Sequence, residues 1–188
     1  PMKTGSDSGN DPLALETAKK TPILRRLDHR PINIHESEII AFCCVRNERV
    51  RLSYFLEYHR SLGIDRFMVV DNASSDGTTD YLLLEKDVHV FYTEESYAQS
   101  ECGVDWLNLL LSNFGAGHWA LTLDADELFV YPLCERAVLK LLTAYLDSVN
   151  AQAVTTFLLD MYSDKSIKDT VCLPGVPFLN ECNYFDNN

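Results

Sequence analysis

The sequence has little positive charge and no long apolar run. Its 188 residues include 16 Lys and Arg against 28 Asp and Glu, so the formal net charge is −12. Because nucleic-acid binding depends on clustered Lys and Arg, this deficit argues against a nucleic-acid partner. Nowhere does the chain reach the roughly 18 consecutive apolar residues that a transmembrane helix needs, so no transmembrane segment is expected.

The six cysteines do not form a metal-binding pattern. None belongs to a C-x-x-C pair or is followed by His at finger spacing, which argues against a structural zinc site. Cys43 and Cys44 lie inside an apolar, strand-like run, which is typical of buried free thiols. No apolar signal-peptide core begins the chain. We therefore expect a cytoplasmic protein, either free or bound peripherally at the inner membrane.

Apolar strand-like runs alternate with amphipathic helix-like segments from residue 37 onward. Continuous apolar runs indicate buried strands, and apolar residues three or four apart indicate helices. The predicted strands span 38–45, 65–71, 88–93, 118–124 and 153–162. The predicted helices span 48–63, 81–84, 104–115 and 135–149. This alternation predicts an α/β fold with a mostly parallel, Rossmann-like sheet flanked by helices on both faces.

The chain divides into three expected regions. Residues 1–36 are predicted to be a flexible tail and lead-in, because the first part carries no periodicity. Residues 37–164 form the predicted domain. Residues 165–188 form an irregular end, which we expect to be a truncated segment. In such a fold ligands bind outside the carboxyl ends of the strands, so the residues that follow each strand are the candidates for a site.

Polar side chains follow three of the predicted strands. They are Arg46 and Glu48 after the first strand, Asp71 and Asn72 after the second, and Asp124 and Asp126 after the fourth. The last pair belongs to the stretch "LDADELFVYP", in which three carboxylates interrupt an apolar segment. In an extended chain Asp124 and Asp126 face one side and Glu127 the other. Two carboxylates on one side are suited to Mg²⁺ or Mn²⁺, with substrate phosphates completing the shell. A solvated, capped strand end is the alternative explanation.

The stretch "VVDNASSDGT" superficially matches a calcium-binding EF-hand loop. Counted from Asp71 the glycine falls one position late, and counted from Asn72 the last ligand position holds Leu83 instead of Glu. An EF-hand is therefore excluded. A strand-to-helix turn, in which Ser and Asp cap the helix, explains most of the stretch but leaves Asp71 without a role.

Together, "VVDNASSDGT" after the second strand and "LDADE" after the fourth resemble the family 2 glycosyltransferases, which have the GT-A fold. The resemblance covers about 37–164 and is strongest to a bacterial subgroup with an Asp-x-Asp-Glu motif. It implies a nucleotide-sugar-binding GT-A domain and a UDP- or GDP-type sugar donor. It also implies Mn²⁺ or Mg²⁺, a glycan or lipid-linked acceptor, and inversion at the transferred carbon.

The resemblance also assigns roles to individual residues. Asp126 is implied to be the metal ligand that meets the donor diphosphate, and Asp124 is implied to share the metal or lie near the ribose. The remaining implied nucleotide-sugar contacts are Cys44, Arg46, Glu48, Asp71, Asn72 and Asn108. Many members carry an Arg before the Asn of this helix, whereas the sequence here reads Asp105-Trp106-Leu107-Asn108.

The general base for the acceptor comes from a later part of the chain in this family. The late carboxylates are Asp160, Asp164 and Asp186. A nucleotide-sugar-binding module that lacks transfer activity is therefore one alternative. A phosphatase of the Asp-x-Asp type is a lesser one, because that pair normally follows the first strand. A sugar nucleotidyltransferase is disfavoured because the loop "CCVRNERV" contains no glycine.

Overall fold

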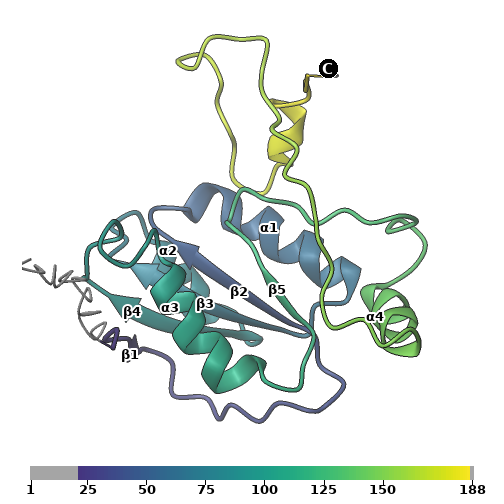
Figure 1. The fold of residues 1–188 in the computed structure, drawn as a ribbon. Coiled ribbons are helices and arrows are strands. Elements are labelled where there is room, and N and C mark those ends of the chain that lie inside the picture. Colours follow the sequence, from purple (N-terminus) through teal and green to yellow (C-terminus); the bar gives the residue numbers. More distant parts are fainter. Residues whose placement is uncertain (1–20, 187–188) are drawn as a thin grey trace, which may run out of the picture.

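The computed structural model describes residues 21–186. The predicted flexible tail therefore lies mostly outside the described residues, apart from the lead-in after residue 20. The described chain forms an α/β domain around one five-stranded sheet (Figure 1). The strand order is β1-β4-β3-β2-β5. The strands are β1 (Arg25–Arg26), β2 (Ile40–Val45), β3 (Arg66–Asn72), β4 (Val88–Thr93) and β5 (Ala120–Thr122).

The sheet is mostly parallel, as predicted. β2 pairs in parallel with β3 and with β5, and β3 pairs in parallel with β4. The two-residue strand β1 is the antiparallel exception on the edge of β4. The sequence did not reveal β1, because two arginines carry no apolar pattern.

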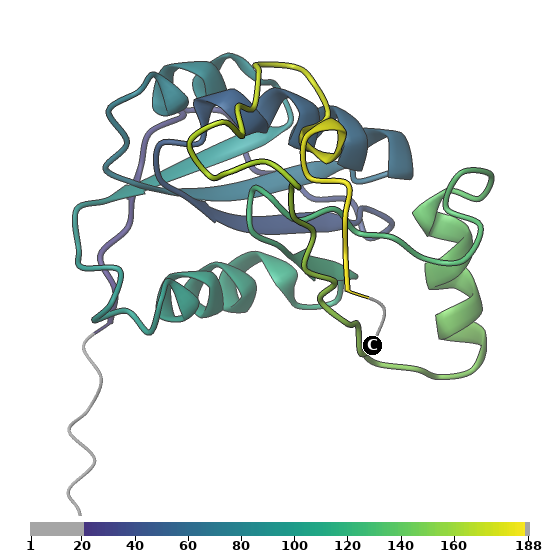
Figure 2. The same ribbon diagram turned by 90° about the horizontal axis from the view of Figure 1, so that it is seen from above.

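Helices cover both faces of the sheet. They are α1 (Arg49–Leu62), α2 (Thr78–Leu84), α3 (Val104–Leu110) with its π-helical continuation Leu111–Gly115, α4 (Leu139–Ser148) and a short 3₁₀ helix (Phe178–Asn180). Figure 2 shows the sheet between α3 on one side and α1 with α2 on the other. Alternate residues of β2 serve the two layers: Ala41 and Cys43 pack with α1, whereas Ile40 and Phe42 pack with α3.

The predicted fifth strand over 153–162 is wrong. Within the described residues this segment makes no ladder, and its single sheet-like contact is an isolated bridge between Tyr162 and Tyr184. The segment follows α4 without joining the sheet; most of its apolar side chains are exposed, and Phe157 is 96% exposed. A strand needs a partner for its backbone groups, and here the segment pairs with no strand of the sheet.

Two other predicted elements are shorter in the structure. β5 covers Ala120–Thr122 because the chain turns at Asp124, although the Leu123 N–H still donates to the Phe42 carbonyl oxygen at 3.1 Å. The helix predicted from residue 135 begins at Leu139, because turns occupy the preceding stretch and Leu133 adopts a φ of 68°. No helix in the described part of the chain is long and apolar enough to cross a membrane.

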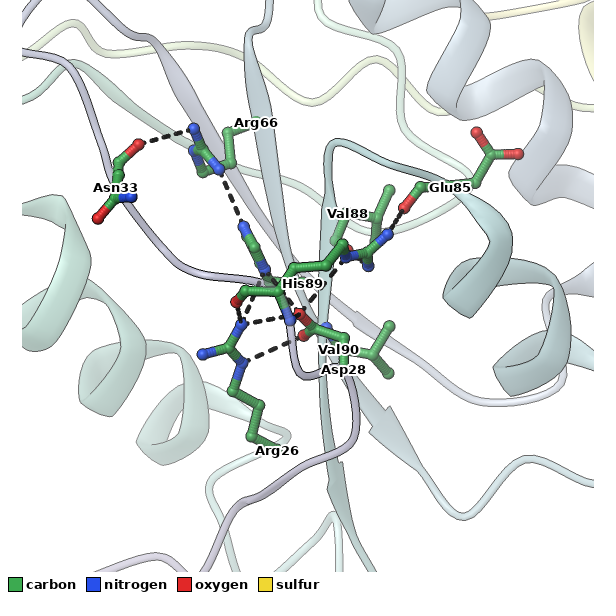
Figure 3. A network of polar contacts seen from close by, with 9 residues as sticks. Arg26, Asp28, Asn33, Arg66, Glu85, Val88, His89 and Val90 are labelled. Carbon is green, nitrogen blue, oxygen red and sulfur yellow. Dashed lines mark hydrogen bonds and ion pairs between the residues drawn. The ribbon is translucent and has the colours of Figure 1, made fainter.

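A buried polar network fixes the lead-in to the edge of the sheet (Figure 3). Asp28 and His89 are 6% and 1% exposed, and their Oδ1 and Nδ1 atoms lie 3.0 Å apart. Arg66 Nη1 lies 2.9 Å from Nε2 of His89 and can only donate, so Nε2 accepts and Nδ1 carries the proton. Asp28 also accepts hydrogen bonds from Arg26 at 2.7 Å and from the Val90 N–H at 3.0 Å.

The charges of this network are set by burial and by these hydrogen bonds. Burial alone raises the pKa of Asp28, but hydrogen bonds from Arg26 and His89 outweigh it and hold this pKa well below its usual value. Burial lowers the pKa of His89 in spite of the neighbouring carboxylate. The folded protein therefore holds a carboxylate and a neutral imidazole here.

His59 connects α1 to the chain beyond β5. It is fully buried, its Nδ1–H donates to the Phe55 carbonyl oxygen at 2.9 Å, and its Nε2 accepts from the Phe129 N–H at 3.3 Å. Burial lowers the pKa of His59 to about 4. Protonation would place a second N–H against the Phe129 donor, so the neutral ring is the form that the fold requires.

From the lowered pKa values of these two histidines we predict that acid reduces the free energy of unfolding at a higher pH than the titration of most carboxyl groups would. Both have folded pKa values below the unfolded value of about 6.5. Their contribution is therefore fully present above about pH 6.5 and is lost as pH falls toward the folded pKa values. Each contributes at most about 1.4 kcal/mol per pH unit. Urea unfolding between about pH 7.5 and 5 should show falling midpoints, less steeply for His59→Gln; flat midpoints would contradict the assignment.

Candidate functional site

The four parallel strands end at the same rim of the sheet, and a cavity of about 390 Å³ lies there. Its walls come from the last residues of β2 and β3 and from the loops that follow β2, β4 and β5. The lining residues are Cys44, Val45, Arg46, Glu48, Asn72, Tyr97, Asp124, Ala125 and Asp126. Positions as far apart in the sequence as Cys44 and Asp126 thus meet because parallel strands bring their carboxyl ends together.

Most of the site residues expected from the sequence lie in this cavity. They are Cys44, Arg46, Glu48, Asn72, Asp124 and Asp126. Asp71 is fully buried beneath the rim, and Asn108 is exposed on α3, so neither lines the cavity.

The late carboxylates lie elsewhere. Asp160, Asp164 and Asp186 are exposed, and none of them lines the cavity. The hydroxyl groups of Tyr184 and Tyr162 donate to Asp164 and Asp186 at 3.4 and 2.9 Å. Among the described residues, the carboxylates that line the cavity are therefore Glu48, Asp124 and Asp126.

A tight turn presents the two aspartates. The Glu127 N–H donates to the Asp124 carbonyl oxygen at 3.0 Å, and the Asp124 N–H donates to the Glu127 carboxylate at 2.9 Å. The segment is thus a turn, not the extended chain assumed from the sequence. Ala125 is buried beneath it, which leaves the side chains of Asp124 and Asp126 exposed at the cavity. Glu127 serves its own loop and not the cavity.

The aspartate pair fits a hard divalent cation by its donor chemistry. Burial raises the pKa of Asp124, and the charge of Asp126 raises it further, which is the signature of two carboxylates in repulsion. A cation would relieve this repulsion, and Mg²⁺ or Mn²⁺ is commonly held by one or two carboxylates with water and phosphate oxygens. No group of three or more His, Cys, Asp or Glu suited to a metal occurs in residues 21–186. A cation held by this aspartate pair would therefore need further oxygens from water or from a bound phosphate.

Arg51 adds a positive charge beside these carboxylates, and its place was not foreseen from the sequence. Its guanidinium donates to both oxygens of Glu48, at 2.7 and 3.3 Å, and Nη1 lies 3.8 Å from Oδ2 of Asp126. Burial raises the pKa of Glu48 even though Arg51 opposes the shift. Because Arg51 lies in the first turn of α1, well beyond the end of β2, the strand-end rule did not select it.

Asn72 contributes an acceptor that has no partner. The residue is 3% exposed, and its Nδ2 donates to the carbonyl oxygens of Thr93 and Glu95 at 3.2 and 3.0 Å. Two carbonyl oxygens can be served only by the amide nitrogen, so the orientation of the side chain is fixed. Its Oδ1 is buried with no hydrogen-bond partner in the structure. Buried acceptors are normally satisfied, so this atom is a candidate acceptor for a ligand N–H.

Asp71 organises the loop that supports the rim. Its carboxylate accepts from the Ser74 N–H at 3.0 Å and from the Thr79 hydroxyl. Ser74 Oγ in turn accepts from the Asn47 N–H at 2.9 Å, which joins this loop to the β2–α1 loop. Asn47 has a φ of 57°, a left-handed conformation that asparagine tolerates better than most residues. The polar side chains of the stretch "DNASSDGT" are thereby explained largely by the hydrogen bonds that connect this loop to the β2–α1 loop.

The remaining wall is formed by Tyr97, Cys44 and the glycine beside them. Gly103 has a φ of 83°, and a Cβ there would lie 3.1 Å from both the Cys44 Sγ and the Tyr97 ring. Burial raises the pKa of Cys44 to about 12, so it remains a thiol at neutral pH and not a nucleophile. Tyr97 is 43% exposed and was missed from the sequence; an aromatic residue just after a strand end was the only available signal.

Comparisons of the chain with protein-family models, with curated proteins and with solved structures found no match.

The turn geometry predicts different effects for two substitutions of Glu127. Glu127→Ala removes the acceptor of the Asp124 N–H and should destabilise the fold by about 1 kcal/mol, the usual net contribution of one hydrogen bond. It should also weaken binding of Mn²⁺, because the aspartates lose their fixed spacing. Glu127→Gln loses the same charge but keeps an acceptor oxygen, and should stay close to wild type. Urea unfolding and Mn²⁺ titration check this; identical behaviour of the two variants would contradict it.

Proposed function

We propose that the protein is a metal-dependent glycosyltransferase with a GT-A-type domain, which moves a sugar from a nucleoside diphosphate to an acceptor hydroxyl. The observation that carries the proposal is the rim cavity, which Asp124 and Asp126 line together with Asn72 and Arg46 at the ends of three strands. The acceptor would be a glycan or lipid-linked molecule, met in the cytoplasm or at the inner membrane surface. The sequence resemblance to family 2 glycosyltransferases supports the same conclusion.

The nucleotide end of the donor would lie against Asn72 and Tyr97. The unpartnered Oδ1 of Asn72 calls for an N–H donor, and Nδ2 is already committed to two carbonyl oxygens. Uracil and guanine present a ring N–H beside a carbonyl, whereas adenine and cytosine present an unprotonated ring nitrogen there and could donate to Oδ1 only through an exocyclic amino group. The exposed ring of Tyr97 would supply a stacking surface.

The diphosphate end would lie toward the aspartates. Asp124 and Asp126 would hold Mn²⁺ or Mg²⁺, and the chemistry supplied by such a cation is Lewis acidity toward the leaving diphosphate. The acceptor oxygen would attack the sugar's anomeric carbon from the face opposite the diphosphate. The bond from that carbon to the diphosphate oxygen would break, its electron pair would leave with the nucleoside diphosphate, and the hydroxyl proton would pass to a base.

A second candidate function is favoured because no carboxylate in the described residues is placed to act as that base. The cavity carboxylates of the described residues all lie near the proposed cation, and the three late aspartates lie away from the cavity. A nucleotide-sugar-binding module without transfer activity would have this arrangement. Metal-dependent hydrolysis of a donor, with water as the acceptor, would favour the enzyme, whereas donor binding without turnover would favour the module.

Nucleotide binding gives the direct test of the proposal. In thermal unfolding, UDP or GDP with Mn²⁺ should raise the melting temperature of the wild type, and Asp126→Ala should remove the rise because it removes a cation ligand. Asp164→Ala, a matched change at an exposed carboxylate away from the cavity, should preserve it. Absence of a shift with every uridine and guanosine diphosphate would sink the proposal.

Base selectivity tests the roles of Asn72 and Tyr97. With a ring N–H as the donor to Asn72 Oδ1, UDP or GDP should bind at least about tenfold more tightly than CDP and ADP, whose unprotonated ring nitrogen would leave that buried acceptor unpaired at a cost of about 1–3 kcal/mol. Tyr97→Ala should weaken every nucleoside diphosphate by about fivefold or more through lost stacking, whereas Tyr97→Phe should not. Calorimetric titration measures both effects. Equal affinity for all four bases would argue against the role of Asn72.

A further inference from the structure

Arg51 occupies a position that its own helix does not favour. It lies in the first turn of α1 together with Arg49, and no acidic residue is present in that turn. A helix N-terminus carries partial positive charge, so cations there are unfavourable by a few tenths of a kcal/mol or more. Two carboxylates offset this cost. Glu48 grips the guanidinium with two hydrogen bonds, and Asp126 lies 3.8 Å from Nη1.

The two contacts differ in strength, and this difference matters. Glu48 is mostly covered, with a side chain 19% exposed, whereas Asp126 is 57% exposed and at more than hydrogen-bond distance from Arg51. Glu48 therefore acts as the anchor, and Asp126 as a loosely held partner. Asp126 is also the carboxylate that the proposed function gives to the cation.

We propose that Arg51 is the resident counter-ion of Asp126. In the free protein Arg51 competes with a divalent cation for Asp126, and once the cation is bound Arg51 donates hydrogen bonds to the donor diphosphate. The inference rests on the proposed function, because it assigns Arg51 to the same site. A ligand at this rim is indicated independently by the buried, unpartnered Oδ1 of Asn72 in the same cavity.

This arrangement couples the two ligands. In the free protein the cation must displace the charge of Arg51 from Asp126, so the cation alone binds weakly. When a diphosphate is present, it offers Arg51 another anion and completes the shell of the cation. Each ligand therefore strengthens the binding of the other, and linkage requires the two effects to be equal. Tight binding of either ligand therefore depends on the other.

The test compares Mn²⁺ binding, followed by electron paramagnetic resonance of the free ion, with and without UDP or GDP. Without nucleotide, Arg51→Gln should bind Mn²⁺ about three- to fivefold more tightly than wild type, as expected for loss of an exposed ion pair. With Mn²⁺ present, the same variant should bind the nucleotide about tenfold more weakly, because charge-assisted hydrogen bonds are lost.

Two control variants separate this effect from a general change of charge. Arg49→Gln removes the same charge from the same helical turn, but Arg49 stacks over the Tyr81 ring at 4.1 Å, so its effect on Mn²⁺ should stay below about twofold. In an Asp126→Ala background, Arg51→Gln should no longer tighten Mn²⁺ binding. Arg51→Lys, which keeps the charge but loses the two-point contact with Glu48, should stay near wild type in Mn²⁺ binding without nucleotide.

The outcomes distinguish the inference from the proposed function. Unchanged or weaker Mn²⁺ binding by Arg51→Gln without nucleotide, or an equal gain in Arg49→Gln, would overturn the role of Arg51. Tighter Mn²⁺ binding by Arg51→Gln, combined with no nucleotide binding by the wild type, would overturn the glycosyltransferase proposal and the diphosphate contact while supporting the competition with Mn²⁺. Absence of Mn²⁺ binding by wild type and by Arg51→Gln, with and without nucleotide, would overturn both the role of Arg51 and the glycosyltransferase proposal.

Discussion

The parallel pairing of β2 with β3 and β5 is the constraint on which the site depends. The register places Val45 beside Asp71 and Phe42 beside Thr122, so the chain leaves these strands at neighbouring points on one edge. Both faces of the sheet are covered by helices, which leaves the rim as the place where polar side chains from several loops meet. The hydrogen bond from the Asn47 N–H to Ser74 Oγ then connects the loops after β2 and β3 and stabilises the rim.

The same burial explains which parts of the fold could be predicted. β2, β3 and β4 are covered on both faces, so their sequences are nearly continuous apolar runs, and their predicted bounds agree with the structure to within two residues. The end of α1 was readable because Gly63 adopts the left-handed conformation that closes it. The segment 153–162 is also rich in apolar residues. An apolar pattern shows that a segment is suited to a strand, but it does not show whether a neighbouring strand is available to pair with it.

Prediction of the site succeeded for side chains that directly follow strands and failed for those positioned by turns. Asn72 and Asp124 lie at strand ends, so topology alone brought them together. Glu127 was expected to face away in an extended chain, but a turn folds its carboxylate back onto the Asp124 N–H. Arg51 and Tyr97 reach the rim from a helix and a long loop, and their directions depend on tertiary packing that residue spacing does not encode.

Charge balance at the rim shows how an acidic protein could hold an anionic ligand. Glu48, Asp124 and Asp126 line the cavity with three formal negative charges. Arg46 lines it with one positive charge, and Arg51, which does not line it, adds a second beside Glu48 and Asp126. The rim is thus net negative by one charge, in line with the formal −12 of the whole chain, and would repel a diphosphate. A single divalent cation would reverse the sign to plus one. Discrimination against a diphosphate that arrives without a cation would then follow from the charges themselves, and the buried acceptor of Asn72 would add selectivity for the base.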